Sequence, residues 1–129
     1  ANMTVGLTIN QGANDNQAFA IKSSDVVHAM TGVTETDTYF EIMKSEGDSG
    51  GATIAGYKDA DGLAGFALQI IGRLSEAADT TKTTSGLGVI HFNSQITDGS
   101  TSVTVPGADG NMIVFSNGSH ARFIFDAEG

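Results

Sequence analysis

The sequence is poor in several residue types, and each shortage limits what the chain can be. It has no cysteine, so a disulfide framework and thiolate chemistry are both excluded. It has no tryptophan, and aromatic residues make up only 7% of its 129 residues. No run of apolar residues approaches the roughly 18 that a transmembrane helix needs. We therefore predict one domain's worth of chain without a membrane-spanning helix.

Basic residues are also scarce. Six lysines and arginines stand against fifteen acidic residues, and the formal net charge is −9. The basic residues occur singly along the chain rather than in clusters. A surface this negative repels phosphate backbones and anionic membranes, so we expect neither nucleic acid nor membrane as a partner.

What the chain does contain is typical of β-structure. There are 17 glycines and a single proline, and short stretches of alternating apolar and polar residues are separated by Gly, Asn and Asp. The segments 23–30 and 73–84 offer one helical turn each, without a sustained 3.6-residue stripe. We predict an all-β fold of short antiparallel strands and hairpins, with strands near 3–9, 17–23, 38–45, 51–59, 65–75, 86–96, 101–105, 111–117 and 121–127.

A weak internal similarity suggests how the chain is organised. The segments QGANDNQAFAIKS (11–23) and PGADGNMIVFSNG (106–118) share a Gly-Ala-Asn/Asp turn followed by a short apolar strand. We therefore predict three parts. A turn-plus-strand segment spans 1–28, a central β domain spans 29–105, and a C-terminal hairpin segment that resembles the first spans 106–129. Because residue 1 is alanine, we expect the chain to be a processed or excised piece of a longer protein.

The motif GDSGG at 47–51 matches the surroundings of the nucleophilic serine in chymotrypsin-like proteases. A serine nucleophile needs a histidine base, a third group that orients the base, and oxyanion donors. Only His28 precedes Ser49, and 129 residues cannot hold the two barrels of such a protease. We interpret the motif as a glycine-rich turn between two strands, with Asp48 and Ser49 at its tip.

No other pattern points to chemistry. The three histidines, His28, His91 and His120, are far apart in sequence and form none of the metal-binding spacings. Phosphate-binding glycine loops are absent too. We predict that the protein is not an enzyme, has no catalytic residue and needs no metal or cofactor.

The chain resembles structural proteins of tailed bacteriophages, of the tail-fibre, tail-spike and appendage type. The likeness lies in the opening MTVGLTINQGANDNQAFAIKSSDVVHAMT and the closing ADGNMIVFSNGSHARFIFDAEG, with further similar stretches in the middle. The resemblance implies a location in the virion or outside the cell. It also implies a self-assembling homo-oligomer, with a trimer favoured, in which terminal strands pair between chains around a central β domain. Other virion proteins and a glycan of the host surface are further partners that it suggests.

Six apolar residues in the terminal segments are the predicted interchain core: Phe19, Ile21, Ile113, Phe115, Phe123 and Phe125. Strand alternation places Phe123 and Phe125 on one face, with Ile124 on the other.

Two alternative functions stay open. One is a glycan-binding adhesin module, and the other is a subunit of an extracellular filament built by strand exchange.

The interpretation of GDSGG as a turn makes a direct prediction. Ser49→Ala should leave the thermal midpoint and the state of association nearly unchanged, because an exposed turn serine contributes little to either. Circular dichroism and light scattering of the two proteins test this. Labelling of Ser49 by a fluorophosphonate would contradict it.

Overall fold

A computed structural model describes residues 6–60, 62–63 and 65–128 of the chain. Within these ranges every regular element is a β-strand, which confirms the predicted all-β fold. No residue of 23–30 or 73–84 lies in a helix, although Ser23 and Val26 close a single hydrogen-bonded turn. The chain divides into two compact units, the first ending at Ile70 and the second beginning at Ile71, and each is described by itself.

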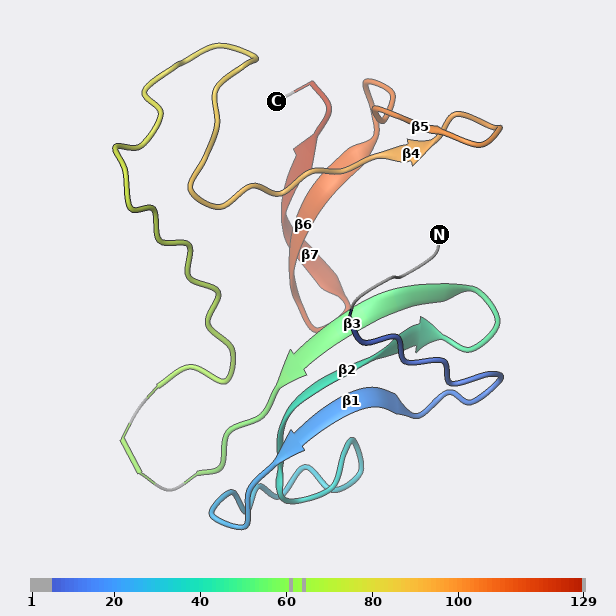
Figure 1. The fold of residues 1–129 in the computed structure, drawn as a ribbon, viewed down its shortest axis with the longest axis vertical. Helices are drawn as coiled ribbons and strands as arrows, with labels where there is room; N and C mark the ends of the chain where they lie inside the picture. Colours follow the sequence, from blue (N-terminus) through green and yellow to red (C-terminus); the bar gives the residue numbers. More distant parts are fainter. Residues whose placement is uncertain (1–5, 61, 64, 129) are drawn as a thin grey trace. The chain divides into compact units, whose positions relative to one another are not determined.

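The first unit contains an antiparallel three-stranded sheet. Its strands are β1 (Gln17–Lys22), β2 (Thr38–Glu46) and β3 (Gly50–Gly56), with β2 in the middle (Figure 1). All three alternate apolar and polar residues or contain β-branched residues, as strands with two different faces do. The sheet therefore has one face built by odd-numbered residues of β2 and one built by even-numbered residues.

The connection from β2 to β3 is the GDSGG turn. Residues 47–49 form it, and Gly50 and Gly51 follow with φ angles of 83° and 75°. These positive values lie in the region that side chains disfavour, which explains the two adjacent glycines. Ser49 is exposed there. The predicted chain reversal is thus confirmed.

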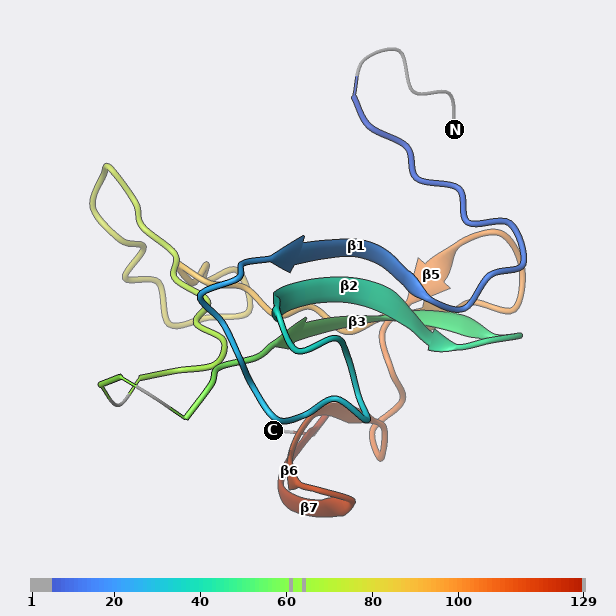
Figure 2. The same cartoon turned by 90° about the horizontal axis from the view of Figure 1, so that it is seen from below.

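The connection from β1 to β2 is longer and covers one side of the sheet. This crossing loop, residues 23–37, lies on one side of the three strands in Figure 2. Backbone hydrogen bonds hold it in shape, including Ser23 N–H to the Asp37 carbonyl at 2.9 Å and His28 N–H to the Thr36 carbonyl at 3.2 Å. The loop is therefore an ordered cover.

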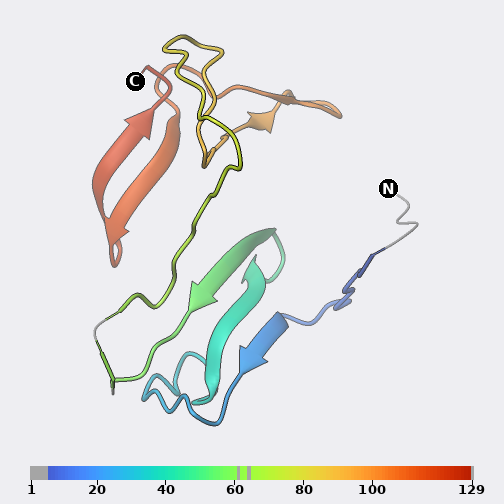
Figure 3. The same cartoon turned by 60° about the vertical axis from the view of Figure 1, so that its left-hand side comes forward.

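The second unit contains two separate strand pairs. The short strands β4 (Ile96–Thr97) and β5 (Val103–Thr104) pair with each other, and β6 (Asn111–Asn117) forms a hairpin with β7 (His120–Asp126). Figure 3 shows the β6–β7 hairpin as a two-stranded ribbon.

The hairpin turn is the one that the sequence signals most strongly. Asn117 pairs with His120, which leaves Gly118 and Ser119 as a two-residue turn. Gly118 has a φ of 58°, which turns of this type need and which glycine adopts without strain. The predicted strands near 111–117 and 121–127 are confirmed, and they pair as an antiparallel hairpin.

Two long predicted strands do not form. The segment 65–75 has no described strand residue, and of 86–96 only Ile96 belongs to a strand. The segments do approach each other, since a Cβ atom at Gly72 would lie 2.7 Å from the carbonyl oxygen of Val89. Alternation alone predicted these strands, but a strand also needs a partner ladder in register. The predicted strand at 3–9 lies partly outside the described residues, and residues 6–9 are not in a strand.

The predicted three-part organisation stays a prediction. In the structure β1, from the predicted first part, pairs with β2, from the predicted central domain. The observed division between Ile70 and Ile71 instead falls inside that central domain.

At one position of the first sheet, Gly56, close packing and not a turn requires a glycine. A Cβ atom at Gly56 would overlap the backbone carbonyl of Ala67, which crosses the end of β3. Gly56→Ala should therefore lower the free energy of unfolding by about 1–3 kcal/mol, as overpacking does. Gly32→Ala is the matched control, because the space around that position is open within 4 Å. Equal urea midpoints for the two variants would contradict the close packing.

Candidate functional site: two open apolar sheet faces

The three-stranded sheet presents its apolar face without a cover that buries it. Register pairs Ile21 with Phe40, and Ile42 with both Phe19 and Ile54, so these five side chains share one face. The rings of Phe19 and Phe40 meet edge to face with centroids 6.3 Å apart. Even so, Phe19 is 43% exposed and Ile54 is 55% exposed. We call this set the first apolar face.

The β6–β7 hairpin has a second such face. Ile113 pairs with Phe125 and Phe115 with Phe123, which places all four on one side. The rings of Phe115 and Phe125 lie 6.0 Å apart at 78°. The three phenylalanines are 50–68% exposed, and Ile113 is half-buried. This set is the aromatic face of the hairpin.

The structure places all six residues of the predicted interchain core on these two faces. Phe19 and Ile21 belong to the first unit, and the other four belong to the second. The alternation prediction is confirmed as well, because Ile124 pairs with Val114 on the opposite side of the hairpin from Phe123. That these residues contact another chain stays a prediction.

The other face of the three-stranded sheet is polar and covered. At its centre is Glu41 of β2, which is 0% exposed beneath the crossing loop. The Thr34 hydroxyl of the loop donates to Glu41 Oε2 at 3.0 Å, and the Tyr57 hydroxyl donates to Oε1. The side-chain amide of Gln17 is a further partner of the carboxylate, and it also donates to the Thr34 hydroxyl at 3.3 Å. These four residues form the Glu41 cluster.

The cluster keeps the buried carboxylate ionised. Burial by itself raises the pKa of Glu41, but hydrogen bonds from Tyr57, Gln17 and Thr34, with the charge of Lys22, together outweigh it. The pKa of Glu41 therefore lies below its ordinary value. The stability that the ionised carboxylate contributes is present above about pH 4.5 and is lost as the pH falls through the lower folded value.

The pKa of Tyr57 shifts in the opposite direction from that of Glu41. Burial and the hydrogen bond to the Glu41 carboxylate raise its pKa from 10.0 to about 12, because both disfavour a phenolate. The neutral hydroxyl therefore stabilises the fold fully below pH 10, and this contribution is lost as the pH rises through 12.

His28 lies beside the cluster, and both of its ring nitrogens form hydrogen bonds with backbone groups. Its ring is tilted over that of Tyr57 with centroids 5.4 Å apart, and it is 2% exposed. Its Nδ1 accepts from the Met30 N–H at 3.3 Å, so its Nε2–H donates to the Thr38 carbonyl at 2.9 Å. The Nε2 bond holds the crossing loop to β2, the Nδ1 bond lies within the loop, and Ser49 is in the turn at the far end of β2.

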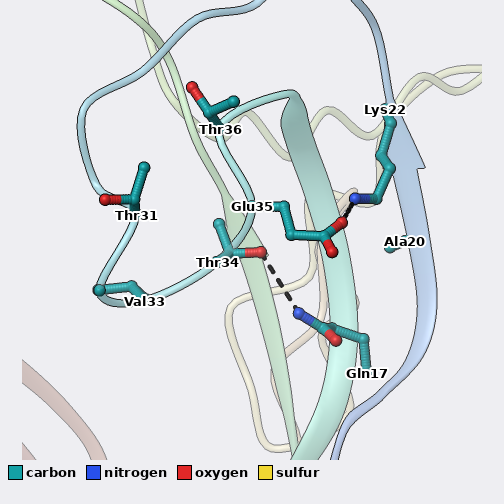
Figure 4. Close-up of a pocket in the computed structure, with 9 residues that line it drawn as sticks. Gln17, Ala20, Lys22, Thr31, Val33, Thr34, Glu35 and Thr36 are labelled. Atoms are coloured by element: carbon teal, nitrogen blue, oxygen red, sulfur yellow. Dashed lines mark hydrogen bonds and ion pairs between the residues drawn. The ribbon is translucent and has the colours of Figure 1, made fainter.

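A hollow of about 500 Å³ lies between the crossing loop and β1 (Figure 4). Several of the polar groups at this hollow bond to one another. Lys22 forms ion pairs with Glu35 and with Asp37, and Gln17 bonds to Thr34. These bonds fasten the loop to the sheet, which is a structural task.

Sequence reasoning missed the Glu41 cluster. An acidic residue at an alternating position of a strand predicts a solvent-facing side chain. The signals that could have found it are indirect. Ala20 and Ala55 flank Glu41 in register, and small side chains on both neighbouring strands leave room for a loop above the carboxylate.

Across the described part of the chain, no three His, Asp or Glu side chains gather as metal ligands do. Nor does that part contain a helix with the length and apolar character to span a membrane.

Comparisons with models of protein families, with curated proteins and with solved structures gave no match for this chain. The two apolar sheet faces and the Glu41 cluster are therefore the features of the chain that bear on its function.

The Glu41 cluster predicts that the two tyrosines differ in their effect on stability. Tyr57→Phe removes a hydrogen bond to a buried carboxylate and should lower the free energy of unfolding by about 1.5–3 kcal/mol at neutral pH. It should also abolish the loss of stability between pH 10 and 12. Tyr39→Phe is the control, because Tyr39 is 39% exposed. Urea unfolding across pH checks both, and equal effects of the two substitutions would contradict the cluster's role.

Proposed function

We propose that this protein is a non-enzymatic structural subunit that completes its hydrophobic core by associating with further copies of itself. One observation carries the proposal. In the described residues no apolar side chain is buried, and the four buried residues, His28, Thr34, Thr38 and Glu41, are all polar. Burial of apolar surface is the main favourable term in folding, so such a chain needs a partner surface.

The area of the chain supports this. Its accessible surface is 10669 Å². A compact monomer of 13.2 kDa would expose only about 6400 Å². Two compact units of half that mass, without any contact between them, would still expose only about 7700 Å². The excess of roughly 3000 Å² per chain is as large as each subunit buries in the most extensive permanent interfaces, which bury about 5000 Å² or more over both partners.

The aromatic residues support it further. Of the seven phenylalanines, every one except Phe40 is exposed. Single exposed apolar residues are normal on a monomer, whereas contiguous apolar patches indicate an interaction surface. Both apolar faces are contiguous, and the strands at their edges have unpaired outer sides within the described sheets.

The resemblance to phage appendage proteins supports a finer proposal. Fibre-like appendages are built from chains whose strands are completed by neighbouring copies. We accordingly assign the chain to a virion appendage, with a homotrimer as the favoured assembly and a location in the virion or outside the cell. An extracellular filament built by strand exchange uses the same exposed surfaces, and the two differ in whether assembly closes.

The mass of the protein in solution tests the proposal. Light scattering should give a closed multiple of 13.2 kDa, three for the favoured trimer. The urea midpoint should rise with protein concentration, because association stabilises only the folded chain. Open-ended polymers would favour the filament over the closed appendage. A folded monomer with a concentration-independent midpoint would overturn the proposal.

A further inference from the structure

The β6–β7 hairpin is the part of the chain whose stability depends most on a covering surface. None of the described residues of the second unit is buried. A two-stranded hairpin is marginally stable in water unless a third strand or another surface covers it. The hairpin nevertheless has seven-residue strands and a well-formed turn. Its aromatic face therefore needs a cover from outside the second unit.

The aromatic face of the hairpin is more exposed to solvent than the first apolar face. On the three-stranded sheet Ile21, Phe40 and Ile42 are already half-buried. On the hairpin Phe115 is 57% exposed and Phe123 is 68% exposed. The three rings of the aromatic face together leave about 350 Å² in water, taking roughly 200 Å² for each whole ring residue. That equals the largest apolar patch on many monomers, gathered here on one small hairpin.

We infer that copies of this chain meet through the aromatic face of the hairpin, each copy placing its Phe115, Phe123 and Phe125 against the same face of another copy. The inference rests on the proposed function and names the surface that joins the copies. Buried aromatic clusters at the centre of an interface are where binding energy concentrates. The edge-to-face packing of Phe115 and Phe125 can be repeated across the contact, since aromatic pairs prefer that geometry.

The distribution of charge along the chain favours a second copy of the chain as the partner of this face. The whole chain carries a net charge of −9, so most contacts between copies bring like charges together. The hairpin, residues 111–126, contains one arginine, Arg122, and one acidic residue, Asp126, and so has no net charge with its histidine neutral. Asp126 alternates with Phe125 and is therefore off the aromatic face, so no acidic side chain of the hairpin lies on that face to repel an identical chain.

The test compares adjacent residues on opposite sides of β7 in the full chain. Phe123→Ser should raise the dissociation constant of the assembly by about a hundredfold or more, as loss of a central aromatic anchor does. Ile124→Ser removes a comparable exposed side chain from the other face, and it should change the constant by less than about threefold. Sedimentation over a range of concentrations measures both.

The outcomes separate the inference from the proposed function. An associating wild-type chain whose dissociation constant is the same with Phe123→Ser overturns the inference alone. Dissociation by Ile124→Ser but not by Phe123→Ser assigns the contact to the other face and also overturns it. A monomeric wild-type chain that Phe123→Ser destabilises places the face within a single chain and overturns both proposals.

A second experiment covers the case in which Phe123→Ser fails to fold. Phe123→Lys and Phe123→Glu should each prevent association, because like charges then meet at the contact. A mixture of the two should associate where neither variant does alone, because chains of opposite charge then meet at the contact. A mixture that stays dissociated contradicts a contact between identical faces.

Discussion

The apolar faces of both sheets have to leave water, and this requirement governs the rest of the structure. The first face brings five aliphatic and aromatic side chains together, and the hairpin brings four. At about 25 cal/mol for each Å² of apolar surface, the rings of the hairpin alone leave several kcal/mol of possible stabilisation unused. A small domain has only about 5–15 kcal/mol in total, so a loss of that size is large.

In the three-stranded sheet, the chain covers the polar face and leaves the apolar face open. The crossing loop covers the polar face, and it does so with bonds to a carboxylate rather than with apolar packing. A buried carboxylate that is fully hydrogen-bonded specifies one arrangement of its surroundings, although it adds little net stability. The Glu41 cluster therefore fixes the shape of the sheet and leaves the apolar side available.

Sequence predicted the well-marked elements and missed those that depend on distant partners. The β6 strand and the turn after it, at Gly118 and Ser119, were found because both signals are local. The segments 65–75 and 86–96 have equally regular alternation, yet they lack a ladder in the described structure, and alternation cannot report that. The six predicted interchain residues fall on two real faces because the period of a strand determines them. The Glu41 cluster was invisible, because its partners come from a loop and from Tyr57, sixteen residues away.

The hairpin turn has a consequence for the order of events during assembly. Asn117 and His120 are close in sequence, and a hairpin of this kind closes within about 1–10 microseconds, whereas assembly of subunits takes milliseconds to minutes and depends on concentration. On the proposed assembly, each newly folded chain presents three phenyl rings to water for nearly the whole of that interval. Local abundance of the chain, and not any step of its own folding, then sets how long the rings remain open to other hydrophobic surfaces.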